Sequence, residues 1–141
     1  LTVNSQMYLR ICSKGKYYYE TIQINVDQDG FYSFTNNDTR RTYGYIYIND
    51  FDPFNPDENL IASSNSSCSS HSFRLGSYFK TNITYILVIT TLEPYIQGAF
   101  QLFVTGIGNA SLNRICKYSC FSFTFVGMCF LFIFVKSKKS T

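Results

Sequence analysis

Four acidic side chains stand close together in one stretch of the chain, and their spacing is suited to binding a metal ion. They are Asp50, Asp52, Asp57 and Glu58. Pro53 and Pro56 lie among them, and proline cannot donate a hydrogen bond to a neighbouring strand, so we expect a surface loop. Calcium takes several converging oxygen atoms, which four carboxylates in one loop can supply. A solvated acidic loop is nevertheless the commoner outcome, so we predict no cofactor, with calcium bound at this loop as the alternative.

Alternating tyrosines form a second candidate site. Tyr43, Tyr45 and Tyr47 recur at every second position of TYGYIYI, so a strand would place all three rings on one face. Aromatic rings offered in a row are suited to stacking against sugars, which predicts ligand binding. The alternative is that the tyrosines simply cover a half-buried sheet face.

A catalytic site is not expected. Ser72 follows His71, but adjacent residues of a strand point to opposite faces. The sequence also lacks the Gly-x-Ser-x-Gly turn that exposes a nucleophilic serine. Zinc is excluded on similar grounds, because the chain has one histidine and no Cys-x-x-Cys pair. We predict that the protein is not an enzyme.

The segment Asp27-Gln28-Asp29-Gly30 begins like a calcium loop but continues with Phe31 and Tyr32. It is therefore predicted to be a turn. Because Asp-Gly favours tight hairpins, we expect the strands on either side of it to pair with each other.

Five cysteines are present, and two of them lie far from the apolar end of the chain. In an oxidising compartment these two, Cys12 and Cys68, would pair as a disulfide. Closing such a long loop would stabilise the fold by about 3–4 kcal/mol. Four Asn-x-Ser/Thr sequons point to the same compartment as glycosylation sites, with unmodified polar turns as the alternative. Their asparagines are Asn37, Asn65, Asn82 and Asn109.

An uncharged run ends the chain. Residues 118–135 carry no charge and are bordered by Lys117 and by Lys136, Lys138 and Lys139. As a helix the run would reach about 27 Å, close to the hydrocarbon thickness of a bilayer. We predict a transmembrane helix at 117–136 and a basic cytoplasmic tail at 137–141, because lysines favour the cytoplasmic side. Phe121, Phe123 and Phe125 alternate with polar residues, so a buried strand is the alternative.

Residues 1–116 then form one extracellular domain, which we expect to follow an export signal outside the given sequence. The whole chain has a formal charge of +3, but four of its twelve Lys and Arg border the apolar run. Residues 1–116 contain the remaining eight Lys and Arg together with nine Asp and Glu, so their net charge is close to zero. A clustered basic face for phosphates is absent, which excludes nucleic acid as an expected partner.

Apolar alternation separated by turns predicts about eight strands. They fall at residues 7–11, 21–26, 31–35, 42–48, 59–62, 72–79, 84–91 and 99–105. The run TYILVITT is apolar on both faces, which indicates a central strand covered on both sides. The predicted fold class is all-β, an antiparallel jelly-roll-like β-sandwich followed by one C-terminal transmembrane helix.

The strand series resembles the bacterial pre-peptidase C-terminal domain and related repeats of secreted and cell-surface proteins. The segments concerned are YYYETIQINV, GFYSFT, TYGYIYI, NLIAS, FRL, TYILVITT and GAFQLFVTG, within residues 17–106. The resemblance implies a jelly-roll β-sandwich that serves as a non-catalytic binding or solubilising module. The chain departs from the family pattern at two places. Members of that family often have an aspartate where this chain has Arg41, and an aspartate-rich loop where it has residues 63–66.

Together these patterns predict a glycosylated, single-pass protein of the cell membrane whose extracellular domain recognises a protein or carbohydrate ligand. The alternative function is that of an accessory substrate- or carbohydrate-binding domain of a larger secreted hydrolase.

Overall fold

The computed structural model describes residues 1, 5–9, 15–36, 42–64, 73–91, 93–96 and 100–115. Within these ranges the fold is all-β, with antiparallel sheets and no helix, which confirms the predicted class. The strands are β1 (Gln6–Leu9), β2 (Lys16–Val26), β3 (Gly30–Asn36), β4 (Thr42–Ile48), β5 (Leu60–Ser63), β6 (Arg74–Phe79), β7 (Tyr85–Thr91), β8 (Leu102–Gly106) and β9 (Ala110–Arg114).

The larger sheet is built around β2 and β7. Its order is β1-β2-β7-β4-β5, and β9 also pairs with β2. Because β2 is 11 residues long, one edge accommodates two partners: β1 pairs with its first part and β9 with its last part. The central strand β7 is buried along its whole length, as its doubly apolar sequence predicts.

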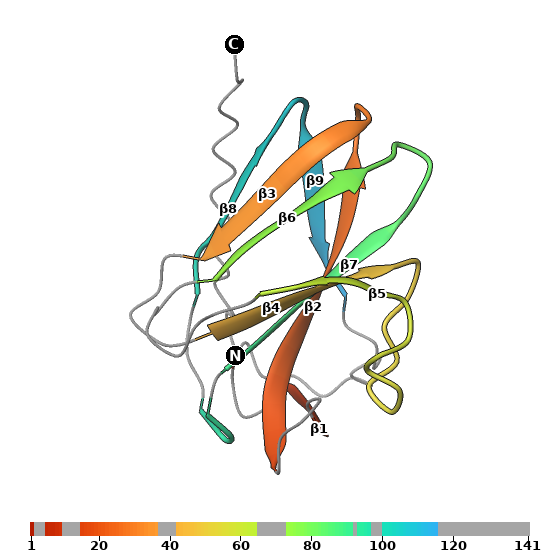
Figure 1. Ribbon diagram of the computed structural model, residues 1–141. Helices are drawn as coiled ribbons and strands as arrows, with labels where there is room; N and C mark the ends of the chain where they lie inside the picture. The colour runs from red at the N-terminus through yellow and green to blue at the C-terminus, as the bar shows by residue number, and fades with distance from the viewer. Residues whose placement is uncertain are drawn as a thin grey trace, which may run out of the picture.

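The smaller sheet has the order β6-β3-β8 and faces the larger one (Figure 1). Side chains from both sheets form one buried core. The larger sheet contributes Ile22, Ile24, Val26, Ile46, Tyr85, Leu87 and Ile89, and the smaller sheet Tyr32, Phe34, Leu75, Phe79, Leu102 and Val104. At Gly44 of β4 the sheets approach closely, since an added Cβ would lie 2.6 Å from Leu75 Cδ1.

A second apolar cluster covers the opposite, outer face of the larger sheet. Its buried members are Tyr8, Tyr17, Tyr19, Tyr45, Tyr47, Phe51, Ile86 and Val88. Phe51 belongs to the loop between β4 and β5, yet it is almost completely buried. This loop, residues 49–59, therefore covers part of this face, and we call it the lid loop. The larger sheet thus packs against other residues on both of its faces.

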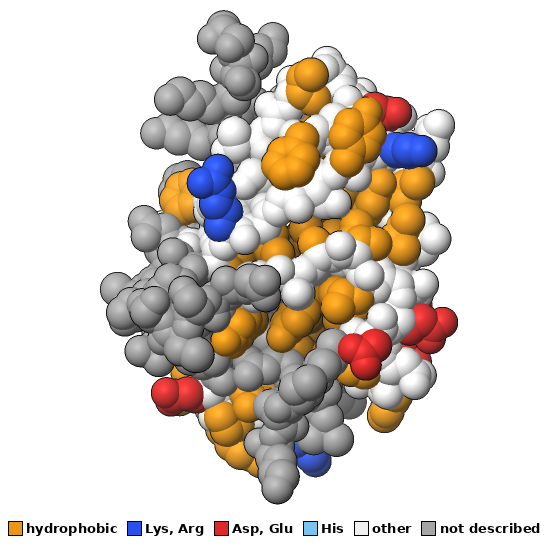
Figure 2. All heavy atoms as spheres, viewed as in Figure 1, with side chains coloured by type: hydrophobic (Ala, Val, Ile, Leu, Met, Phe, Trp, Pro, Cys, Tyr) orange, Lys and Arg blue, Asp and Glu red, His pale blue; other side chains and the backbone are white. Residues whose placement is uncertain are grey.

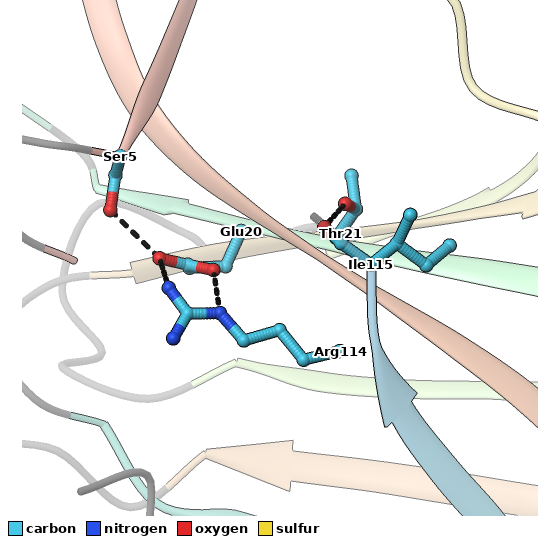
Figure 3. A network of polar contacts seen from close by, with 5 residues as sticks. All are labelled: Ser5, Glu20, Thr21, Arg114 and Ile115. Atoms are coloured by element: carbon cyan, nitrogen blue, oxygen red, sulfur yellow. Dashed lines mark hydrogen bonds and ion pairs between the residues drawn. The ribbon is translucent and has the colours of Figure 1, made fainter. Parts of the chain in front are cut away.

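The last strand, β9, is tied to β2 by polar groups as well as by its ladder (Figure 3). Arg114 donates from Nε to Glu20 Oε2 at 2.7 Å and from Nη2 to Glu20 Oε1 at 2.5 Å. The Ser5 hydroxyl donates to the same Glu20 carboxylate at 2.7 Å. Beyond the strand, Thr21 and Ile115 exchange a backbone and a side-chain hydrogen bond. Glu20 is thus a buried charge with several partners, as a buried carboxylate requires.

The turn at Asp29-Gly30 differs from its prediction. The strands β2 and β3 belong to different sheets, so the turn carries the chain across the core and joins no hairpin. Gly30 does not have a positive φ. Its missing side chain instead leaves room for Ile107, whose Cγ2 would lie 2.5 Å from an added Cβ.

No helix in the described part of the chain is long and apolar enough to cross a membrane. The predicted span at 117–136 and tail at 137–141 lie outside the described residues.

Candidate functional site

An open groove of about 990 Å³ lies on the outer side of the larger sheet, beside the lid loop. One wall comes from β1 and the start of β2, and the other comes from the loop that follows β4. The lining residues are Gln6, Met7, Tyr8, Lys16, Tyr19, Asp50, Phe51, Asp52, Pro53, Phe54 and Pro56. A concave site with an apolar lining and a few polar groups is the usual form of a ligand pocket.

Edge-to-face aromatic contacts build the floor of the groove. The Tyr8 and Tyr19 rings pack with centroids 5.1 Å apart, and Phe51 contacts them at 5.7 and 5.4 Å respectively. Tyr47 lies below, with its ring centroid 4.8 Å from that of Phe51. Aromatic rings favour such geometry because their positive edges meet negative faces. The floor is therefore rigid, since each ring is held by others from a different segment.

The wall made by the loop is shaped by its own hydrogen bonds. Asp52 Oδ1 accepts from the Phe54 N–H at 2.9 Å, and Asp52 Oδ2 accepts from Asn55 Nδ2 at 2.8 Å. Such bonds from an aspartate to the next turn are a common way to fold a loop. The Tyr47 hydroxyl donates to the Pro56 carbonyl at 2.8 Å, which fastens the loop to β4. Burial raises the pKa of the Tyr47 phenol above its ordinary value, so this donor stays protonated.

The predicted calcium ligands are not brought together. Within the described ranges, which include Asp50, Asp52, Asp57 and Glu58, no three His, Cys, Asp or Glu residues are grouped so as to hold a metal ion. Both carboxylate oxygens of Asp52 accept hydrogen bonds from residues of the loop. Asp57 and Glu58 lie later in the same loop, and their side chains are exposed. The four acids lie on one loop, as predicted, and the buried side chain of that loop is Phe51. Calcium binding at this loop stays a prediction.

The tyrosine stripe lies on one face, as its spacing indicates. Tyr45 and Tyr47 are buried in the outer cluster and Tyr43 is half-buried against it. Their rings therefore contribute to the covered face beneath the lid loop. Sugar stacking on all three rings stays a prediction. The groove lies above buried rings of the same cluster, Tyr8, Tyr19 and Phe51.

Charged groups of both signs line the groove. Lys16 lies at the start of β2, while Asp50 and Asp52 lie on the facing wall. Phe54 stands at this wall with 89% of its surface exposed. The arrangement can hold a ligand by contact with rings and by charge, and sequence reasoning missed it. The available signal was an aromatic residue between two acids, in Asp50-Phe51-Asp52.

Three turns meet at one end of the molecule (Figure 1). One of them, the connection after β6, also adjoins the start of the lid loop, because the Asn49 N–H donates to the Thr84 carbonyl at 2.8 Å. In the turn after β2, Asp27 Oδ1 accepts from the Asn109 N–H at 2.7 Å and Asp27 Oδ2 accepts from Asn109 Nδ2 at 2.9 Å. Asp29 Oδ1 accepts from the Thr81 N–H at 2.7 Å. This backbone hydrogen bond is the main cause that lowers the pKa of Asp29. The two aspartates thus have a structural role, as their turn-like context predicts.

The other predicted sites divide into two groups. Asn82 and Asn109 are both exposed at this end of the molecule. The residues outside the described part of the chain are Cys12, Cys68, Asn37, Asn65, His71 and Ser72. The predicted disulfide and all four predicted glycosylation sites therefore stay predictions.

Comparison with known proteins gives no relative: no family model, no curated protein and no solved structure matches this chain. The resemblance to the pre-peptidase C-terminal domain stays a prediction on the quoted strand segments.

Proposed function

We propose that this chain is a non-catalytic recognition module displayed at the cell surface. In this proposal residues 1–116 form a jelly-roll-like β-sandwich outside the cell, 117–136 cross the membrane as a helix, and 137–141 lie in the cytoplasm. The groove beside the lid loop binds an extracellular protein or carbohydrate. The observation that carries the proposal is the rigid aromatic floor of this groove between charged walls.

The chemistry of the groove suits binding. Tyr8, Tyr19 and Phe51 are packed against one another beneath the groove, so its walls are held in place before a ligand arrives and little freedom is lost on binding. Lys16 and Asp50 on opposite walls would orient a ligand that carries both charges or several hydroxyl groups. Phe54, exposed at the wall, offers further contact area of the kind that dominates binding energies.

Membrane display is tested with the full chain, tagged at its N-terminus and expressed in mammalian cells behind an added export signal. We expect the tag to be accessible to antibody on intact cells and the protein to stay with membranes after carbonate extraction. A chain that is released into the carbonate supernatant would contradict the anchored arrangement.

Recognition is tested by measuring adhesion of these cells to arrayed glycans, polysaccharides and extracellular-matrix proteins. Phe54→Ala should reduce binding to the selected ligand at least about tenfold, since a central aromatic contact is worth 1–2 kcal/mol or more. Tyr95→Ala, at a similarly exposed aromatic outside the groove lining, serves as the control. Equal binding by wild type and Phe54→Ala would rule out the groove. Selection of an insoluble polysaccharide would favour the alternative, an accessory domain of a secreted hydrolase.

A further inference from the structure

An exposed apolar patch lies on the outer face of the smaller sheet, on the side opposite to the groove. Phe31 and Tyr78 are directly opposite each other on β3 and β6, and 62% and 59% of their surfaces are exposed. The Phe31 ring lies over Gly76, where an added Cβ would be 2.5 Å from Phe31 Cζ. Ile107 is also exposed, but it packs against the core-facing side of Gly30, whose cross-strand partner is the buried Phe79, so it lies on the other side of β3. We call Phe31 and Tyr78 the aromatic patch; Figure 2 shows hydrophobic side chains gathered on this face.

Two sequon asparagines lie in the turns that meet near the start of β3, where Phe31 is located. Asn82 lies in the turn that follows β6, four residues after Tyr78. The preceding Thr81 is hydrogen-bonded to Asp29, two residues before Phe31, so this turn adjoins the start of β3. Asn109 lies two residues after Ile107 in the turn between β8 and β9. An exposed apolar patch usually has an occupant, and these positions are where a covalently attached sugar would begin.

The two asparagines differ in how their side chains are held. Asn109 donates from Nδ2 to Asp27, and its main chain exchanges two further hydrogen bonds with the same residue. For Asn82, no side-chain hydrogen bond occurs within the described part of the chain. A sugar on Asn82 would therefore disturb no polar contact, whereas one on Asn109 would have to share the amide with Asp27.

We propose that the aromatic patch is the packing surface for an N-linked glycan on Asn82, whose first N-acetylhexosamine lies against Tyr78 and Phe31. The inference rests on the extracellular location in the proposed function. A pyranose ring has one face lined by C–H groups, and such a face is attracted to the negative face of an aromatic ring. The glycan would also shield a patch that would otherwise favour association.

The covalent step is an exchange at one amide. Asn82 Nδ2 forms a bond to C1 of the sugar of a lipid-linked oligosaccharide diphosphate, and the bond from C1 to the phosphate oxygen breaks. The amide loses one proton, the lipid diphosphate leaves, and no oxidation or reduction takes place.

The experiment uses the full chain made in the secretory pathway of mammalian cells, with glycan occupancy read by mass spectrometry. Thermal unfolding is then compared in a double-mutant cycle of Asn82→Gln and Tyr78→Ser. We expect Asn82 to be occupied and the glycan to raise the unfolding midpoint by roughly 2–5 °C. This increase should disappear in the Tyr78→Ser background and persist in the Tyr95→Ser control, which removes a similarly exposed tyrosine elsewhere. A nuclear Overhauser contact between the acetyl methyl of the first sugar and the Tyr78 ring should accompany it.

Three results would overturn the inference. They are an unmodified Asn82 in the exported chain, an equal stabilisation with and without Tyr78, and the absence of the sugar-to-ring contact. These failures are distinguishable from failure of the proposed function. A chain that is not exported would carry no glycan at any sequon, and its N-terminal tag would be inaccessible on intact cells.

Discussion

Phe51 and Phe54 show how two identical side chains three residues apart take different roles. Phe51 is 1% exposed and contacts the rings of Tyr8, Tyr19 and Tyr47, whereas Phe54 is 89% exposed at the wall of the groove. The first holds the lid loop on the sheet, and the second is available to a ligand.

This contrast gives a prediction about stability. Phe51→Ala should lower the free energy of unfolding by about 3–5 kcal/mol, because it leaves a cavity among buried rings. Phe54→Ala should change it by less than about 0.5 kcal/mol, since the side chain is exposed. The measurement is urea unfolding of both variants followed by circular dichroism. A similar loss in both variants would show that the loop is not anchored through Phe51.

Residue types alone predicted which side chains are buried in the strands, but not which loop residue is buried. Apolar residues alternate in residues 21–26 and 42–48, and Ile22, Ile24 and Ile46 from these segments lie in the core. Phe51 carries no periodic signal, since it lies between two aspartates in an irregular segment. Its burial follows from the long-range packing of β1, β2 and the loop, which a local pattern does not contain.

At the scale of elements, the three turns at one end of the molecule are held by carboxylates that accept N–H donors. Asp29 accepts from Thr81 in the turn after β6, and Asp27 accepts from Asn109 in the turn after β8. Each bond joins a turn that crosses between the sheets to another turn, so these bonds fix the ends of both sheets relative to each other.

The turn contact through Asp29 predicts a dependence of stability on pH. The Thr81 N–H holds the pKa of Asp29 below its ordinary value of about 3.8, so the ionised carboxylate stabilises the folded state. This contribution is fully present above about pH 4, the unfolded pKa, and is lost as the pH falls through the lower folded pKa. Asp29→Asn should therefore have a lower urea midpoint than wild type at pH 7.

The difference between Asp29→Asn and wild type should shrink as the pH falls below about 4, because wild type then also becomes neutral at this position. Glu58→Gln, at an exposed acid of the lid loop, is the matched control. A gap between Asp29→Asn and wild type that stays constant down to pH 2 would refute the linkage.

Eight strands were predicted along the chain and the structure has corresponding strands for all of them, but β9 was missed. Its sequence ASLNR has only Ala110 and Leu112 directed at the core, with polar residues between and after them. Two small apolar positions do not distinguish a strand from a polar turn. Pairing with β2, which has a free edge beyond β1, is what makes this segment a strand.

For the molecule as a whole, the Glu20–Arg114 ion pair links β2 to β9 and so joins residues that are 94 positions apart in the sequence. The Glu20 side chain is 7% exposed and that of Arg114 is 31% exposed. Removing the arginine leaves a buried carboxylate with fewer donors, which is costly, while solvent near the arginine moderates the loss.

We therefore expect Arg114→Met to lower the free energy of unfolding by about 2–3 kcal/mol, with Arg114→Lys intermediate because a lysine lacks the two-pronged geometry. Glu20→Met combined with Arg114→Met should recover part of the loss, since it removes the uncompensated charge. Urea unfolding of Arg114→Met, Arg114→Lys, Glu20→Met and the double variant measures the coupling, because urea is uncharged and does not screen the ion pair. A double variant that loses the sum of both single effects would contradict the pairing.

The overall class could be predicted because alternation with period two recurs along most of residues 1–105, while the assignment of strands to sheets could not. The order of strands in a sheet depends on pairing between segments that are far apart in the sequence, as between β2 and β9. Several strands with unpaired edges can compete for the same partner, and a local sequence pattern does not show which one pairs. The groove arises from such a pairing, where β1 lies against β2 beside the lid loop.

The two-partner edge of β2 has a consequence for how the chain is made. Synthesis begins at the N-terminus, so residues 22–26 leave the ribosome long before Ala110–Arg114, the segment that completes their edge. In the interval an apolar strand has unpaired N–H and C=O groups along one side, and such edges recruit other extended chains. Newly made protein should thus be prone to aggregate until Ala110–Arg114 has been made, and a chaperone that covers extended segments would be useful in that interval.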